Sequence, residues 1–166
     1  MRVLSHHAVD GDGVGNFSGH ALSLNEDGSI LAVGAYNASR SPFQEESTDK
    51  NIGQVKIYKW NVTTDAWDSH GNILYGHNQG DRFGISCQLN PVGNLLVVGS
   101  SASRDNDTQV TTGSVEIYNF ENGNWNQIGQ TIYGENNSGF GTATCISTLS
   151  VNDQITIAAA GDKMCD

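Results

Sequence analysis

Residues 83–134 read FGISCQLNPVGNLLVVGSSASRDNDTQVTTGSVEIYNFENGNWNQIGQTIYG, and the pattern of this segment recurs along the chain. Residues 17–76 carry the same pattern, and a third copy begins at Phe140 with FGTATCIS. Phe17 and Phe83 are 66 residues apart, and Phe83 and Phe140 are 57 apart. A repeat of this length is typical of a propeller blade or a solenoid unit, which needs neighbours to cover its apolar faces.

Each copy of the repeat predicts four strands. The first copy opens with two apolar runs around the turn Asn25–Ser29, whose Asp-Gly pair is a strong hairpin signal. An alternating third strand follows at residues 54–60, and a fourth begins at Trp67, which Trp125 matches in the second copy. Four antiparallel strands per repeat form the blade of a β-propeller. We therefore predict an all-β fold with about two and a half blades.

The repeats divide the chain into four segments. We expect the remnant of a preceding blade and an inter-blade loop at residues 1–16, and a first blade at residues 17–76. A second blade is expected at residues 77–134 and the first hairpin of a third at residues 135–166. Closed propellers have about 4–8 blades, so we expect further blades or other subunits to complete the ring.

Three short motifs identify a resemblance to a known repeat. Phe83-Gly84, Val33-Gly34-Ala35 and Gly53-x-Val55-x-Ile57-Tyr58 together resemble the FG-GAP repeat, which forms the propellers of integrin α-chains and of many bacterial and algal surface proteins. The resemblance covers nearly the whole chain and implies the propeller fold. It does not imply the calcium site of that family, because the turns at residues 25–29 and 90–94 are too short for six to eight oxygen ligands.

Charge and hydropathy exclude two classes of partner. The 166 residues carry a net charge of −10 with only eight Lys and Arg, which are scattered along the chain. A nucleic-acid backbone requires clustered basic residues, so we expect no nucleic-acid partner. We also expect no membrane insertion by this chain, because it contains no run of about 18 apolar residues.

The three cysteines form no recognisable ligand pattern. Cys87 and Cys145 fall in matching predicted strands, and we interpret both as buried small apolar residues. Cys165 lies next to the last residue. Zinc spacing is missing, and the odd number leaves the disulfide state open.

One glycine-rich segment has the look of a calcium loop. Asp10 and Asp12 occupy the first two alternate ligand positions of residues 10–16, but Val14 stands at the third. No bidentate Glu follows at the twelfth position. We favour a connection between blades over a metal site, and we predict no cofactor.

Two polar loops are the candidate ligand-binding surface. They join the second and third strands of each repeat and should emerge on one face of the disc, where loops carry function. The alternative interpretation is ordinary solvated charge. The acidic candidates are Glu45, Glu46 and Asp49 in the first loop and Asp105 and Asp107 in the second.

Five Asn-x-Ser/Thr sequons favour an exported or lumenal glycoprotein. We expect Asn16 to be a poor glycosylation site because it adjoins Phe17, which the repeat predicts to be buried. The other four sequons fall in predicted loops or turns, at Asn37, Asn61, Asn106 and Asn136.

The favoured function is a non-catalytic binding or scaffold module for a protein or a glycan. Every recurring residue has a packing explanation, and the remaining residues suggest no Ser-His-Asp or Cys-His arrangement. Two alternatives stay open. The chain could be a segment of a propeller hydrolase or lyase whose active site lies outside it, or a structural subunit whose blade edges pair with other chains.

Overall fold

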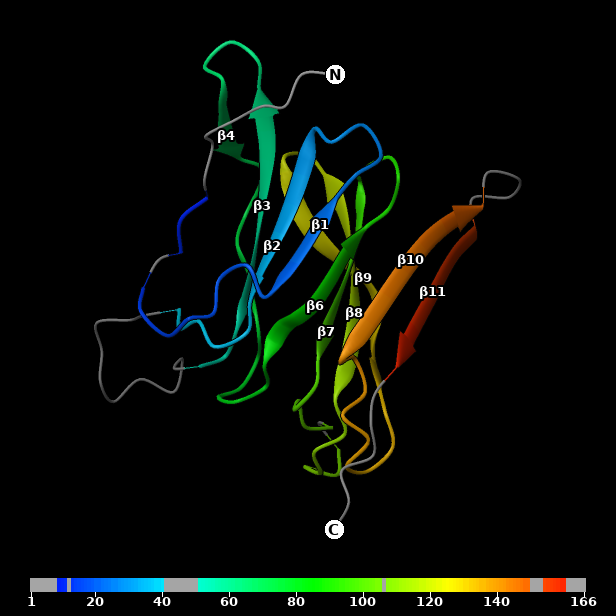
Figure 1. Cartoon of the computed structure of the whole chain (residues 1–166). Coiled ribbons are helices and arrows are strands. Elements are labelled where there is room, and N and C mark those ends of the chain that lie inside the picture. Colours follow the sequence, from blue (N-terminus) through cyan, green and yellow to red (C-terminus); the bar gives the residue numbers. More distant parts are fainter. Residues whose placement is uncertain (1–8, 12, 41–50, 106, 150–153, 161–166) are drawn as a thin grey trace.

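The computed structural model describes residues 9–11, 13–40, 51–105, 107–149 and 154–160 (Figure 1). All regular elements in these ranges are β-strands, so the all-β prediction is confirmed. No helix in the described part of the chain is long and apolar enough to cross a membrane. The strands are β1 (Ala21–Leu24), β2 (Ile30–Ala35), β3 (Gln54–Asn61), β4 (Ala66–Ser69), β5 (Leu74–Tyr75), β6 (Phe83–Leu89), β7 (Leu95–Ser100), β8 (Ser114–Glu121), β9 (Asn124–Tyr133), β10 (Ala143–Leu149) and β11 (Gln154–Ala160).

The strands form two antiparallel sheets and a separate hairpin. The first sheet has the order β1-β2-β3-β4, with the short β5 also paired to β3. The second sheet has the order β6-β7-β8-β9, and β10 pairs with β11. The fourth strand of the first sheet is interrupted between Ser69 and Leu74, whereas β9 continues through the matching positions with one register shift.

Buried asparagines close the first turn of each sheet. The Asn25 Oδ1 atom accepts the backbone N–H of Ile30 at 2.9 Å. Asn90 takes the same place in the second sheet and is 1% exposed. Its Oδ1 atom accepts the backbone N–H groups of Gly93, Asn94 and Leu95. These bonds satisfy the turn donors and fix the hairpins that the apolar runs predict.

Successive sheets pack through one recurring contact. The first strands β1, β6 and β10 lie side by side in Figure 1, and β6 contacts both β1 and β10. A Cβ atom on Gly34 would overlap the carbonyl oxygen of Gly84, because β2 passes so closely over β6. Gly99 stands in the same relation to Gly141. The small residues at the ends of β2 and β7 are therefore required by close approach of the backbones.

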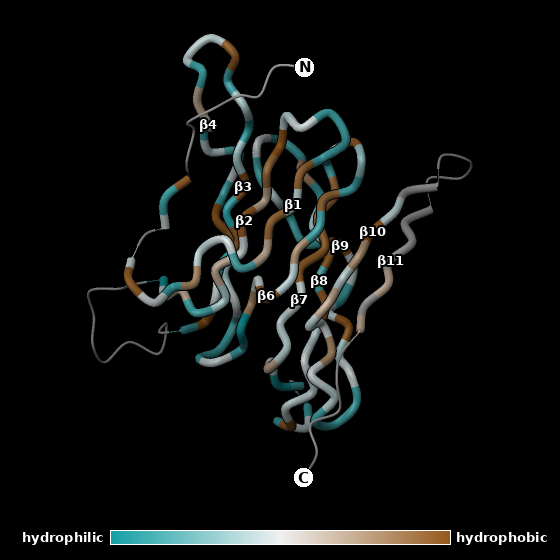
Figure 2. The backbone as a smooth tube through the Cα atoms, viewed as in Figure 1, coloured by the Kyte–Doolittle hydropathy of each residue, from teal (hydrophilic) through white to brown (hydrophobic). Residues whose placement is uncertain are grey.

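Two apolar clusters fill the spaces between the sheets, and apolar colour follows the strands in Figure 2. The first cluster joins the first and second sheets, with Val55 and Ile57 on one side and Leu96 and Val98 on the other. The second cluster joins the second sheet to the hairpin, through Leu95, Val97, Val115 and Ile146. Apolar residues from adjacent sheets thus share each core.

The segment between β4 and β5 holds Trp125 of the second sheet. Asn72 accepts the backbone N–H of Trp125 through Oδ1 at 2.7 Å and donates to its carbonyl through Nδ2 at 3.3 Å. The indole Nε1 donates to the carbonyl of His70 at 2.9 Å. Trp125 is 2% exposed as a result. This segment, residues 70–72, therefore fixes the outer strands of the two sheets against each other.

The structure corrects the sequence alignment of the first repeat by one residue. Ala21 pairs with Gly34 as Ser86 pairs with Gly99, so Ser18 rather than Phe17 is the counterpart of Phe83. The backbone agrees, because Phe17 has a φ of 54° and Arg82, which precedes Phe83, has 59°. Phe17 is 55% exposed, so the expectation of a buried Phe17 was wrong. Its ring stacks on Tyr36 with 5.0 Å between centroids.

The cysteine prediction was correct for one residue and wrong for the other. Cys87 is buried at 8% exposure, and burial raises the pKa of its thiol to about 12. Cys145 is exposed. It pairs with Ala158 on a face of the β10–β11 hairpin that the second sheet does not cover.

Candidate functional site

Loops from both sheets gather at one end of the molecule. Because the sheets are antiparallel and repeat one strand order, the connections β2–β3, β5–β6, β7–β8 and β9–β10 emerge together, at the lower end in Figure 1. The β1–β2, β3–β4, β6–β7 and β8–β9 turns lie at the opposite end. We call the first group the loop end. It carries most of the residues that the sequence singles out.

The loop acids divide into residues that shape the loop and residues that are exposed. The Oδ1 atom of Asp105 accepts the backbone N–H of Asp107 and of Thr108, and the Thr108 hydroxyl donates to it as well. These bonds lower the pKa of Asp105, with the Thr108 bonds the largest cause. Asp105 therefore holds the loop in shape, while Asp107 is exposed. Glu45, Glu46 and Asp49 lie outside the described residues.

The sequons lie at both ends of the molecule. Asn37 is half-buried at the loop end, and its Nδ2 donates to the carbonyl of Gly15 at 2.8 Å. Asn61 lies at the opposite end, where Oδ1 accepts the Thr63 N–H and Nδ2 donates to Asp68 at 2.7 Å. Asn16 is half-buried, Asn136 at the loop end is exposed, and Asn106 lies outside the described residues.

Only one of the two acids in the calcium-like segment, residues 10–16, lies in the described part of the chain. Asp10 is exposed, and Asp12 lies outside the described residues. No group of three or more His, Cys, Asp or Glu side chains that could hold a metal ion occurs in the described ranges.

A buried acid beneath the loop end is the site that the sequence did not predict. Glu116 lies in β8 at 1% exposure. Its Oε1 atom is 2.9 Å from Nε2 of His77, and its Oε2 atom accepts a hydrogen bond from the Tyr118 hydroxyl. Asp81, at 2% exposure, lies nearby in the β5–β6 connection and accepts the backbone N–H of Asn78 at 2.7 Å. His77, Glu116, Tyr118 and Asp81 form what we call the acid cluster.

The electrostatics of the acid cluster favour the protonated form of His77. The hydrogen bond to Glu116 raises the pKa of His77, and the charge of Asp81 acts in the same direction, while Arg40 opposes it. Burial raises the pKa of Asp81. Burial and the adjacent Glu116 raise the pKa of Tyr118, so its hydroxyl remains a donor.

The acid cluster can bind and release a proton, but it contains no activated nucleophile. Both carboxylate oxygens of Glu116 are hydrogen-bonded within the protein. One sequence signal could have revealed it: residues 116, 118 and 120 share a face of an alternating strand. Tyr118 and Phe120 make that face aromatic, so an acid at position 116 required a partner.

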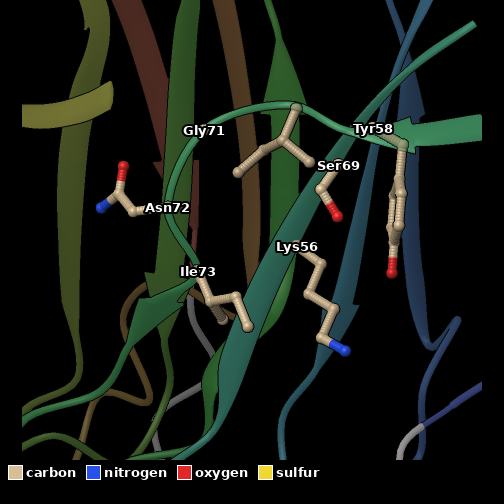
Figure 3. Close-up of a pocket in the computed structure, with 7 residues that line it drawn as sticks. Lys56, Tyr58, Ser69, Gly71, Asn72 and Ile73 are labelled. Carbon is tan, nitrogen blue, oxygen red and sulfur yellow. The ribbon is translucent and has the colours of Figure 1, made fainter. Parts of the chain in front are cut away.

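A shallow pocket lies beside β3 (Figure 3). Its cavity volume of about 70 Å³ is far below the roughly 300–1,000 Å³ of small-molecule sites. The side chain of Asn72, which contributes to one wall, is already bonded to Trp125. The pocket is lined by Lys56, Ile57, Tyr58, Ser69, Gly71, Asn72 and Ile73.

No protein-family model matches the chain, and no curated protein shows a significant match to it.

Proposed function

We propose that each sheet is one blade of a β-propeller and that the chain is a non-catalytic binding or scaffold module. A recurring contact between sheets supports this most directly. The parallel bridge between Gly53 and Phe83 recurs between Gly113 and Phe140, each time joining one sheet to the start of the next repeat. Four-stranded antiparallel sheets packed repeatedly in one way around an axis form a propeller. The resemblance of the repeats to the FG-GAP family supports the same fold.

The loop end is the proposed binding surface, with a protein or a glycan as partner. Binding residues are often found on loops that a rigid scaffold positions. Arg104 and Asp107 are exposed in the β7–β8 loop, and the bonds of Asp105 hold that loop in one conformation. Asn136 is exposed at the same end, which is compatible with the proposed exported or lumenal glycoprotein.

Binding is favoured over catalysis because three acids of the acid cluster and the β7–β8 loop have structural roles. Asp81 and Asp105 accept backbone N–H groups, and Glu116 binds two side chains. An acid engaged in this way is not poised beside a substrate.

Binding to arrays of purified glycans and of peptides tests the proposed function. We expect saturable binding that the double substitution Arg104→Ala and Asp107→Ala weakens at least about tenfold. Glu121→Ala, at the opposite end of the molecule, is the matched control and should bind as the unmodified chain does. Hydrolysis of an arrayed glycan, or equal binding by both variants, would contradict the proposal.

A further inference from the structure

The outer face of the first sheet exposes leucines whose counterparts in the second sheet are buried. Leu22 is 62% exposed and Leu24 is 55% exposed. Their strand partners are Val33 and Leu31. In the second sheet the same four positions are occupied by Cys87, Leu89, Leu96 and Val98, which pair in the same register.

The second sheet shows what covers such a face. Cys87 and Leu89 are 8% and 3% exposed because the first sheet packs on them. The first sheet contributes Ala21 and Ala32 to that cluster, and the backbone N–H of Leu89 donates to Ser23 Oγ at 2.9 Å. We call the exposed face of the first sheet that carries Leu22 and Leu24 the leucine face. A surface of small residues on the first hairpin of another repeat is thus its natural complement.

The β10–β11 hairpin carries that complement at the other end of the chain. Ala143 pairs with Ala160 and Cys145 pairs with Ala158, which matches the pairing of Ala21 with Gly34 and of Ser23 with Ala32. All three hairpin counterparts, Ala143, Cys145 and Ala158, are exposed. The chain therefore presents both halves of its own inter-sheet contact, one at each end of the stack.

The aromatic residues of the outer strands also differ in burial between the two sheets. Trp60 and Trp67 pack edge to face with 5.3 Å between ring centroids, and Phe120 and Trp125 pack in a tilted arrangement at the same distance in the second sheet. Trp125 is 2% exposed because residues 70–72 cover it, whereas Trp67 is half-buried. The leucine face thus extends to the outer strands.

We propose that copies of this chain associate head to tail, with the β10–β11 hairpin of one copy packed on the leucine face of the next. The proposal rests on the blade assignment made above. Such a contact joins two different surfaces, so it leads to a closed ring or to an open filament.

Sedimentation velocity over a range of protein concentrations tests the association. We expect a reversible complex of the unmodified chain, and we expect Leu22→Asp and Ala158→Arg each to abolish it. Each variant loses one surface and keeps the other, so an equimolar mixture should form a one-to-one complex that neither variant forms alone. Val92→Asp is the matched control, because Val92 is 68% exposed in the β6–β7 turn of the second sheet, which contributes to neither proposed surface. Far-ultraviolet circular dichroism confirms that each variant is folded.

Three outcomes overturn the proposal: an unmodified chain that is monomeric at every concentration, association that survives either substitution, and a mixture without the one-to-one complex. Loss of association with Leu22→Asp alone would indicate that two leucine faces meet instead. The array experiment with the Arg104 and Asp107 variant measures ligand binding at the loop end and does not depend on self-association. A chain that fails to self-associate would therefore not contradict the proposed binding function.

Discussion

The imidazole Nε2 of His77, in the β5–β6 connection, lies 2.9 Å from Oε1 of Glu116 in β8. The two residues are 39 positions apart. The bond ties the connection between the first and second sheets to an acid that is 1% exposed. The loop end is therefore anchored to the interior of the second sheet.

Replacement of Glu116 should destabilise the protein. Glu116→Ala leaves the Tyr118 hydroxyl without its acceptor in a buried position, and we expect the free energy of unfolding to fall by about 1–3 kcal/mol. Glu116→Gln keeps an acceptor for Tyr118 and should lose less. Urea denaturation measures both values. Glu121→Ala, at an exposed position of the same strand, is the control, and a comparable loss there would contradict a specific role for Glu116.

The His77–Glu116 pair should make stability depend on pH near neutrality. The pKa of His77 is raised in the folded protein, so its contribution is complete below the unfolded value of about 6.5. It is lost as the pH rises through the folded value. His77 is 60% exposed, so screening limits the effect to less than about 1 kcal/mol.

The comparison with His77→Gln isolates this effect. His70, whose pKa burial lowers, contributes with the opposite sign, but it is present in both proteins and cancels. The raised pKa of Asp81 acts in a more acidic range, where stability falls as the pH rises above about 3.8. Urea midpoints between pH 6 and pH 9 should fall more steeply for the unmodified chain than for the variant. Parallel curves would refute the prediction.

Close packing between sheets predicts that alanine is not tolerated at Gly34 or Gly99. A Cβ atom at either position would overlap a backbone carbonyl of the next sheet, which cannot rotate away as a side chain would. We expect a loss of about 1–3 kcal/mol or more for each substitution, measured by thermal or urea unfolding. Gly13→Ala is the control, because its Cβ would meet only the end of the Asn16 side chain at 3.4 Å.

Local signals in the sequence were sufficient for the strands but not for their exact alignment. The alternation of residues 54–60 and the Asp-Gly turn predict β3 and the β1–β2 hairpin, because strand period and turn chemistry are local. The two phenylalanines suggested a repeat boundary one residue away from the structural one. The boundary is set by backbone conformation, with a left-handed residue at Phe17 and Arg82 followed two positions later by Gly19 and Gly84.

The acid cluster could not be predicted because it depends on tertiary contacts. His77 approaches Glu116 only after the β5–β6 connection folds over β8, and nothing in the repeat pattern specifies that path. Position 116 is occupied by an acid in the second sheet, whereas its counterpart in the first sheet is Lys56. A feature that differs between two copies gives no periodic signal.

The cysteines should react at very different rates. Cys145 is exposed, whereas Cys87 is buried and its pKa is raised to about 12. The Cys87 thiol is therefore inaccessible to a reagent and remains protonated. With Cys165 replaced by Ser, an aromatic disulfide reagent should label one thiol in the folded protein and a second only in denaturant. Cys145→Ser should remove the fast reaction. Rapid labelling of that variant under native conditions would contradict the buried position of Cys87.

Asn72 should act as a clamp between the outer strands of the two sheets. Asn72→Ala removes two hydrogen bonds to the backbone of Trp125, and we expect a loss of about 1–2 kcal/mol in unfolding free energy. Trp125 should then become accessible to water, which shifts its fluorescence to longer wavelength. Asn126→Ala is the control, because the Nδ2 atom of Asn126 donates to the carbonyls of Glu121 and Asn124 within its own hairpin. Equal loss of stability in both variants, without a spectral shift in either, would show that Asn72 does not join the sheets.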